Sequence, residues 1–416
     1  MFSHFFKKWG FRKETSIHLD YASATPVSPE VAFAMKPYFS DTWANPSALY
    51  RSAVKAREAI DRARTDIGRM LRIRPADVTF TSGGTESNNL ALFGMVDFLK
   101  AQGRTYADME IVSTRMEHPS VLGALNVLRE RGVVVKFIQV SEDGLVDSVH
   151  LKSLLSNRTV LVTLAYANSE IGVVQDIKKI TRTVRACATE YNVVIRVHVD
   201  ASQAPLWLPC EMDMLGVDLM TLDAGKCYGP KGVGVLALRH GVSLVPQLHG
   251  GGQERGLRST TENVPGIVGC AYALVSAQKA WRVRSADAIE LRDYMFKILQ
   301  KEIPDIMVNG SRTERIANNV NISIRGVDTE FAVIALDAKH ISASTRSACG
   351  STEQSGSHVV YEISHDTERA QSTLRFTLGL DTKKDEIEYA VKILSTHVQK
   401  MRTFKPSVAY EEFDTT

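Results

Sequence analysis

Apolar residues follow two alternating patterns along the middle of the chain. Short runs rich in β-branched residues predict strands, and longer segments with apolar residues every three or four positions predict helices. Strands are expected at 77–82, 110–115, 133–140, 159–167, 193–202, 218–225 and 232–239. Helices are expected between them at 85–100, 120–132 and 176–191. This order predicts an α/β fold whose large domain has a mostly parallel sheet covered by helices on both faces.

The pattern changes near residue 275, and the segments after it predict a smaller α+β C-terminal domain. They are a charged helix at 277–303, a strand at 318–326, a helix at 329–339, a Ser/Gly-rich loop at 342–357, a strand at 372–379 and a helix at 384–401. We therefore expect three parts. They are an N-terminal segment, 1–31, that packs on the small domain; a large ligand-binding domain, 32–275; and the small domain, 276–416, with a mobile cysteine loop at 342–357.

Length and composition narrow the class of protein. A chain of 416 residues is too long for one small core. The net charge of +3, from 50 basic and 47 acidic residues, argues against a dedicated nucleic-acid binder. No apolar run approaches the ~18 residues that a membrane span needs. The five scattered cysteines contain no CxxC pair, so they indicate neither a metal site nor a disulfide framework and fit a reducing cytoplasm.

The first residues, MFSHFFKKWGFRK, are basic and aromatic. Their apolar stretches are too short for a secretory signal. This stretch is either a loosely packed terminus or a segment that lies on a membrane surface or a partner.

Candidate site residues gather at the carboxyl ends of the predicted strands, where ligands bind in such sheets. They are Gly84, Thr85, His118, Asn168, Asp200 and Lys226. Gly83-Gly84-Thr85 follows one strand and opens a helix, which favours an anion site over a plain capping box. His118 either stacks on an aromatic ligand and moves protons or has a structural role.

Asp200, at the end of a buried strand, is either a helix N-cap or the partner of a protonated ring nitrogen. Gln203 follows three residues later and would reach a phenolate oxygen of the same ring.

Three further residues carry reactive or charged groups in unusual places. Lys226, in LDAGKCYGPKGVG, is either a surface charge or an amine that forms a Schiff base with an aldehyde. Cys349 lies in a polar loop, where a free cysteine is uncommon, and Arg346 would favour its thiolate. Arg375, within a strand-like run, favours a substrate carboxylate. Together with the anion site, these groups describe a pyridoxal phosphate pocket.

The motifs around these residues resemble those of cysteine desulfurases in the class V aminotransferase family, which has fold type I and uses pyridoxal 5'-phosphate. The similar segments run from about 19 to 401 in the family's order. They include LDYASATP, NPSALY, FTSGGTESNN, EHPSV, EIGVVQDI, HVDASQA, YGPKGVG, GGGQERGLRSTTEN, SACGS and LRFTLG.

The resemblance implies a role for each candidate residue. Lys226 would form the Schiff base, Asp200 would hold the pyridine nitrogen, Gln203 would bind the phenolic oxygen, and His118 would stack on the ring. Gly84 and Thr85 would bind the phosphate, together with Thr261 from the second subunit of a homodimer. Arg375 and Asn168 would bind the substrate. Cys349 would take sulfur from L-cysteine as a persulfide and leave L-alanine. The acceptor would be an iron–sulfur scaffold or a tRNA-thiolation protein.

The sequence departs from the family at the phosphate end. The family usually has Ser-x-His-Lys where this chain has Asp223-Ala224-Gly225-Lys226, and an ionised Asp223 would repel a phosphate. Lys231 and Arg258 are candidates to compensate. Ser169 stands where a second Asn is common, and Tyr50 where a His is common.

Two alternatives to a cysteine desulfurase remain open at this point. One is a lyase that acts on selenocysteine or cysteine sulfinate. The other is a degenerate paralogue that only binds a partner.

Overall fold

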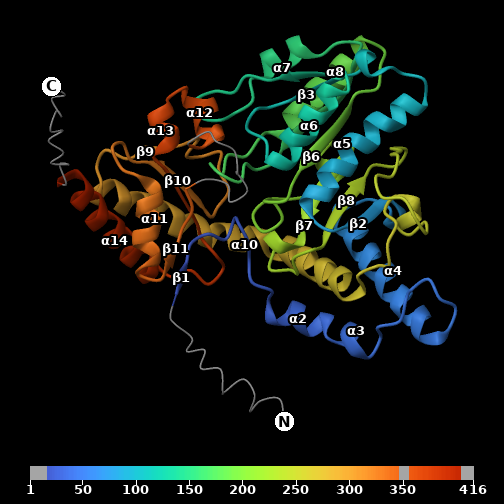
Figure 1. Ribbon diagram of the computed structural model, residues 1–416, viewed down its shortest axis with the longest axis horizontal. Helices are drawn as coiled ribbons and strands as arrows, with labels where there is room; N and C mark the ends of the chain where they lie inside the picture. The colour runs from blue at the N-terminus through green and yellow to red at the C-terminus, as the bar shows by residue number, and fades with distance from the viewer. Residues whose placement is uncertain (1–15, 346–355, 404–416) are drawn as a thin grey trace, which may run out of the picture.

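A computed structural model describes residues 16–345 and 356–403 (Figure 1). Its largest sheet has seven strands in the order β2-β8-β7-β6-β5-β3-β4. They are β2 (Val78–Thr81), β3 (Glu110–Ser113), β4 (Val134–Phe137), β5 (Thr159–Ala165), β6 (Arg196–Asp200), β7 (Leu219–Asp223) and β8 (Gly234–Leu238). β8 is antiparallel to both of its neighbours, and the other pairs are parallel. The predicted α/β fold with a mostly parallel sheet is confirmed.

Helices cover both faces of this sheet. One face packs against α4 (Arg51–Leu71), α8 (Ile177–Glu190) and α10 (Val264–Glu302), and the other against α5 (Gly84–Ala101) and α6 (Pro119–Glu130). Within β5, Leu161 packs with α5 and α6, while Val162 and Leu164 pack on the opposite face. The continuous burial of this strand follows from cover on both sides.

The remaining described elements of the large part are short and lie around this sandwich. They are α2 (Pro29–Met35), α3 (Pro37–Ser40), α7 (Ser148–Leu154), α9 (Met212–Leu215), and the 3₁₀ turns η1 (Pro75–Asp77), η2 (Tyr106–Asp108), η3 (Ala224–Lys226) and η4 (Glu254–Gly256).

The C-terminal part has its own sheet and core, as expected for a smaller α+β unit. A three-stranded antiparallel sheet has the order β12-β10-β9. Its strands are β9 (Met307–Val308), β10 (Asn319–Ser323) and β12 (Thr373–Thr377), and its helices are α11 (Thr329–Asp337), α12 (His358–Ser364), α13 (Thr367–Gln371) and α14 (Lys384–Thr403). Phe296, Phe376 and Leu394 are among the buried residues of this second core.

Helix α10 begins earlier than the sequence pattern predicts, at Val264 instead of 277. The side chain of Asn263 caps its start by accepting a hydrogen bond from the amide of Gly266, and Pro265 occupies the first turn. The helix then runs from the large sheet into the second core (Figure 1), so the boundary expected at 275/276 falls inside it.

The N-terminal segment passes from the small part to the large part. Its strand β1 (Ile17–His18) pairs in parallel with β11 (Ile341–Ser342). The amide of Thr25 then donates to the carbonyl of Gly225, next to the large sheet. Residues 19–25 therefore lie between the two parts of the molecule.

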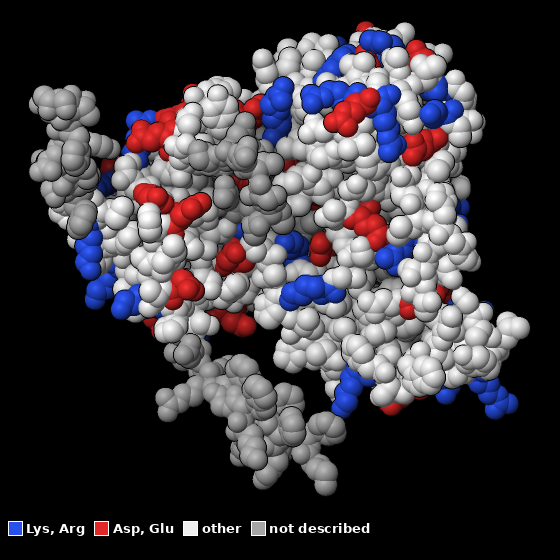
Figure 2. Space-filling model, in the orientation of Figure 1, with Lys and Arg blue, Asp and Glu red and all other residues white. Residues whose placement is uncertain are grey.

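Basic and acidic side chains are interspersed over the face shown in Figure 2. Among the described helices, none combines the length and the apolar character needed to cross a membrane. The basic aromatic stretch at 1–13 lies outside the described residues.

Candidate active site

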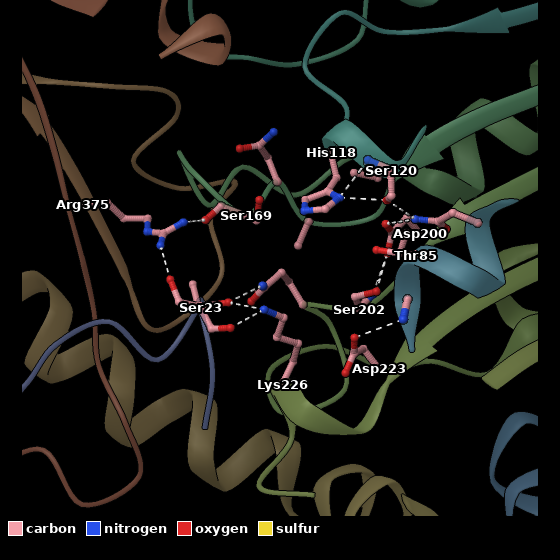
Figure 3. Close-up of a pocket in the computed structure, with 17 residues that line it drawn as sticks. Ser23, Thr85, His118, Ser120, Ser169, Asp200, Ser202, Asp223, Lys226 and Arg375 are labelled. Atoms are coloured by element: carbon pink, nitrogen blue, oxygen red, sulfur yellow. Dashed lines mark hydrogen bonds between the residues drawn. The ribbon is translucent and has the colours of Figure 1, made fainter. Parts of the chain in front are cut away.

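A cavity of about 190 Å³ lies at the carboxyl ends of β5, β6 and β7 (Figure 3). Eight of the predicted catalytic and binding residues line it: Gly84, Thr85, His118, Asn168, Asp200, Gln203, Lys226 and Arg375. Thr261 is exposed and does not line this cavity. Cys349, with Arg346 and most of the cysteine loop, lies outside the described residues.

Asp200 presents its carboxylate at the end of β6 and is 9% exposed. Its Oδ2 accepts a hydrogen bond from Asn88 Nδ2 at 2.7 Å, and its Oδ1 accepts from the amide and hydroxyl of Ser202 at 2.9 and 2.6 Å. The next helix, α9, begins only at Met212, so Asp200 does not cap a helix. A carboxylate held in this way is suited to a protonated ring nitrogen.

His118 sits at the N-terminus of α6 and projects into the cavity (Figure 3). Its Nδ1 accepts the backbone amide of Ser120 at 3.1 Å, so a neutral ring carries its proton on Nε2. Burial lowers the pKa of His118, while the nearby carboxylate of Asp200 opposes the shift. The ring is therefore neutral near pH 7.

Lys226 follows β7 through the turn η3 and faces the N-terminal segment. Its Nζ donates to the carbonyl oxygens of Ala22 and Ser23 at 2.9 and 2.5 Å. Gln203 Nε2 donates to the same Ala22 oxygen at 3.0 Å. The amine thus lies in the wall of the cavity beside Gln203 and is not an ordinary surface charge (Figure 3).

Arg375, on β12, closes the cavity from the small part. Its guanidinium donates to Asp20 Oδ1 at 2.7 Å, to Ser23 Oγ at 2.9 Å and to the Ser169 carbonyl at 2.9 Å. The Arg375 side chain is 3% exposed, and its Nε is buried without a hydrogen-bond partner among the described residues. Donors therefore remain for a substrate carboxylate, although Asp20 already neutralises part of the charge.

Asn168 shapes the turn that carries Ser169. Its Oδ1 accepts the amides of Glu170 and Ile171 at 2.9 and 3.0 Å, and its Nδ2 donates to the Met116 carbonyl at 2.8 Å. The side chain lines the cavity, but most of its polar capacity is used in holding the turn.

The end of the cavity expected to receive a phosphate is the N-terminus of α5, where the N-cap residue, Gly83, has no side chain to cap the helix. A Cβ built on Gly84 would lie 2.9 Å from Ser202 Oγ, so the backbone is open to a ligand only because residue 84 is glycine. However, Asp223 Oδ2 accepts the Gly84 amide at 3.1 Å. An anionic side chain of the protein itself therefore stands at this end (Figure 3).

The two cations that could offset this charge have other partners. Arg258 forms an ion pair with Glu86 at 2.8 Å, and Lys231 donates to the Thr25 carbonyl. Tyr50 is 57% exposed. None of these three residues lines the cavity.

The donor set fits pyridoxal 5'-phosphate at its ring and aldehyde. Asp200 offers a carboxylate for the ring nitrogen, Lys226 an amine for the aldehyde, Gln203 an amide for the phenolic oxygen, and His118 a flat neutral ring. The open backbone at Gly84 fits a phosphate, whereas the carboxylate of Asp223, bound to the Gly84 amide, opposes the binding of a phosphate.

The sequence reasoning missed Glu117, which precedes His118 and is 2% exposed. Its Oε1 accepts the Thr114 hydroxyl at 2.6 Å, and its Oε2 is buried without a hydrogen-bond partner in the described structure. Burial, reinforced by Asp200, raises the pKa of Glu117 to about 8. Like His118, Glu117 follows a predicted strand, and this position was the signal by which the sequence could have identified it as a candidate site residue.

Replacing Glu117 with glutamine is expected to flatten the pH dependence of stability. The pKa is about 8 in the folded chain against an ordinary value of 4.5, so the folded state binds the proton more tightly. The resulting stability is full below pH ~4.5 and is lost as the pH rises through 8. The wild-type free energy of unfolding should fall by about 3 kcal/mol more than that of E117Q between pH 5 and 8.

Urea unfolding at several pH values measures this difference. Glu130→Gln, at the exposed last residue of α6, the helix that begins just after Glu117, is the control and should track the wild type. Parallel profiles for the wild type and E117Q would show that Glu117 is not protonated in the fold.

Comparisons with known proteins agree with this geometry. The family model for class V aminotransferases matches residues 17–390. The cysteine desulfurase IscS of Dictyoglomus turgidum is 37% identical over 390 residues, which cover 94% of this chain and 96% of that protein. The cysteine desulfurase IscS of a Neisseria meningitidis strain is 36% identical over 396 residues, or 94% and 95% of the two chains.

A solved structure of a NifS-like protein superposes with a TM-score of 0.85 at 29% identity. The match covers 93% of this chain and 100% of the NifS-like chain. The family resemblance read from the motifs is therefore confirmed: the chain belongs to the class V aminotransferase family, whose members use pyridoxal 5'-phosphate.

Proposed function

We propose that this chain is a cysteine desulfurase, which removes sulfur from L-cysteine and leaves L-alanine with pyridoxal 5'-phosphate as cofactor. The observation that carries the proposal is the convergence of Lys226, Asp200, His118 and Arg375 on one cavity. The relatives named cysteine desulfurase, at 36–37% identity over nearly the whole chain, support it.

The cofactor, when bound, supplies an electron-accepting ring that stabilises negative charge at the substrate Cα. Asp200 would hold the protonated ring nitrogen through a charge-assisted hydrogen bond, and Gln203 would donate a hydrogen bond to the phenolic oxygen. Lys226 would hold the aldehyde, and its amine is the group placed to exchange the proton at the substrate Cα. His118, neutral and with its proton on Nε2, would stack on the ring.

Arg375 orients the substrate by its carboxylate. Arg375→Gln is expected to raise the KM for L-cysteine about tenfold or more, because charge-assisted hydrogen bonds are lost, with a smaller change in kcat. Steady-state kinetics at saturating cofactor measure both constants.

The matched control is Arg369→Gln on α13, whose guanidinium bonds to Asn309 Oδ1 and the Val308 carbonyl away from the cavity. That variant should change stability rather than KM. An equal rise in KM for both variants would remove Arg375 from the substrate site.

Cys349 is the proposed sulfur acceptor within the chain, and it would carry the sulfur as a persulfide. The next acceptor would be an iron–sulfur scaffold or a tRNA-thiolation protein, in the cytoplasm. The name of the IscS relatives supports the first of these routes.

The working form is proposed to be a homodimer in which Thr261 of one subunit reaches the phosphate end of the other. Large apolar side chains are exposed along the segment that contains α2 and α3. They are Phe33, Phe39, Trp43, Leu49 and Tyr50, each more than half exposed. An apolar stretch of this size on a single chain is typical of a protein–protein interface and supports the dimer.

An absorbance titration tests the activity. The purified chain is mixed with pyridoxal phosphate and then with L-cysteine, and alanine is assayed. A visible band that shifts with L-cysteine, accompanied by alanine, supports the desulfurase. Alanine formed from selenocysteine or cysteine sulfinate but not from L-cysteine would favour a related lyase, and no band at saturating cofactor would favour a non-catalytic binding protein.

A further inference from the structure

The phosphate end of the cavity contains a carboxylate that is bound by the protein's own backbone. We infer that the Asp223 carboxylate competes with the cofactor phosphate for the same backbone donors. The chain therefore binds pyridoxal phosphate mainly by its ring and aldehyde, and its affinities for pyridoxal phosphate and pyridoxal differ little. The inference rests on the proposed function, because it concerns the same cofactor site.

The carboxylate of Asp223 takes up two backbone donors. Its Oδ2 accepts the Gly84 amide at 3.1 Å, and its Oδ1 accepts the Gly225 amide at 2.8 Å. The first donor belongs to the opening turn of α5, where the helix dipole favours a negative charge. The side chain thus occupies the Gly84 amide, which would otherwise be free to donate to a phosphate.

Gly225 is part of the same arrangement. A Cβ built on Gly225 would lie 3.2 Å from Asp223 Oδ1, which is tighter than ordinary van der Waals contact. A larger residue at 225 would therefore crowd the carboxylate in its present position. The two departures from the family pattern, Asp223 and Gly225, act as one structural unit.

Arg258 and Lys231, two cations near the phosphate end, bind groups other than the Asp223 carboxylate. Arg258 is paired with Glu86, and Lys231 donates to the Thr25 carbonyl. An incoming phosphate would meet a like charge and would have to displace the carboxylate from its donors, both of which lower affinity. The ring and the aldehyde meet no such opposition at Asp200 and Lys226.

The experiment compares the affinities of pyridoxal phosphate and pyridoxal for the wild type, Asp223→Ser and Asp223→Asn. Equilibrium dialysis and the absorbance of the bound cofactor supply readouts independent of turnover. Asp223→Asn keeps the shape and removes the charge, and Asp287→Asn, at an exposed site on α10, is the control. Free pyridoxal forms an internal hemiacetal, but this lowers its affinity equally for every variant and cancels in the comparison.

We expect the preference for pyridoxal phosphate over pyridoxal to rise about tenfold or more in D223S and D223N and to stay unchanged in D287N. A preference in the wild type as large as that in D223S would overturn the inference and leave the proposed function intact. Failure of every variant to bind either compound would instead refute the proposed function, and the inference would fall with it.

The pairing of the two departures gives a second readout. Gly225→His alone is expected to weaken cofactor binding, because the new side chain crowds Asp223. In the Asp223→Ser background the same change should be neutral or favourable. Equal effects of Gly225→His in both backgrounds would show that residues 223 and 225 act separately.

Discussion

Replacing Lys226 with alanine is expected to abolish the absorbance band of the covalently bound cofactor and to lower turnover of L-cysteine by about 10³-fold or more. The Lys226 amine lies in the cavity wall, held by the Ala22 and Ser23 carbonyls and next to Gln203. Within residues 16–345 and 356–403, no other lysine lines this cavity. The aldehyde would therefore lose its covalent partner while the carboxylate of Asp200 remained in place.

Lys231→Ala is the matched control, because Lys231 lies in the same turn but binds the Thr25 carbonyl instead of lining the cavity. It should keep the band and the reaction with L-cysteine. Persistence of the band in K226A would assign the covalent bond to another amine and remove the central element of the proposed mechanism.

The second large effect is expected for Cys349→Ser, which should keep the cofactor band and lose release of sulfide by about 10³-fold or more. The remaining cysteines are poor substitutes. Cys187, Cys210, Cys227 and Cys270 are all buried, and burial raises the pKa of each thiol. Because the thiolate is the nucleophile, these four residues offer little reactive sulfur near neutral pH.

Mass spectrometry of the wild type after a single turnover should locate one added sulfur atom on the peptide that contains Cys349. Cys187→Ala serves as the control and should leave sulfide release unchanged. Normal sulfide release by C349S would mean that the sulfur leaves the site by another route, without a persulfide on this residue.

The strands of the large sheet were predictable because their apolar runs are strong, and three of them, β2, β3 and β5, are followed by a helix of clear period. The start of α10 at Val264 was not predictable in this way. Gly266 and Gly269 lie in its first turns and interrupt the apolar pattern, yet a Cβ on Gly269 would lie 2.6 Å from Met35 Sδ. Glycine permits α2 to pack closely there, and close packing between helices distant in sequence leaves no local signal.

The convergence of the candidate residues on one cavity was predictable in the same way, since parallel strands bring their carboxyl ends to one edge of a sheet. The hydrogen bonds that hold these residues in place were less predictable from the sequence. Asn88 lies one helical turn after Gly84 and donates to Asp200, but the two residues are 112 positions apart. That the amides of Gly84 and Gly225 both bind Asp223 likewise depends on backbone geometry, which residue identities do not reveal.

The contacts of Arg375 constrain when the site can form during synthesis on the ribosome. Arg375 binds Asp20 and Ser23, which precede it by 355 and 352 residues. The large sheet has all of its strands once Leu238 has emerged, and N-terminal units generally fold first. The nascent chain can therefore carry a folded sheet with Lys226 in position, yet it lacks the wall built by β12 until translation is almost complete. Capture of cofactor in a closed pocket is consequently an event of the finished chain.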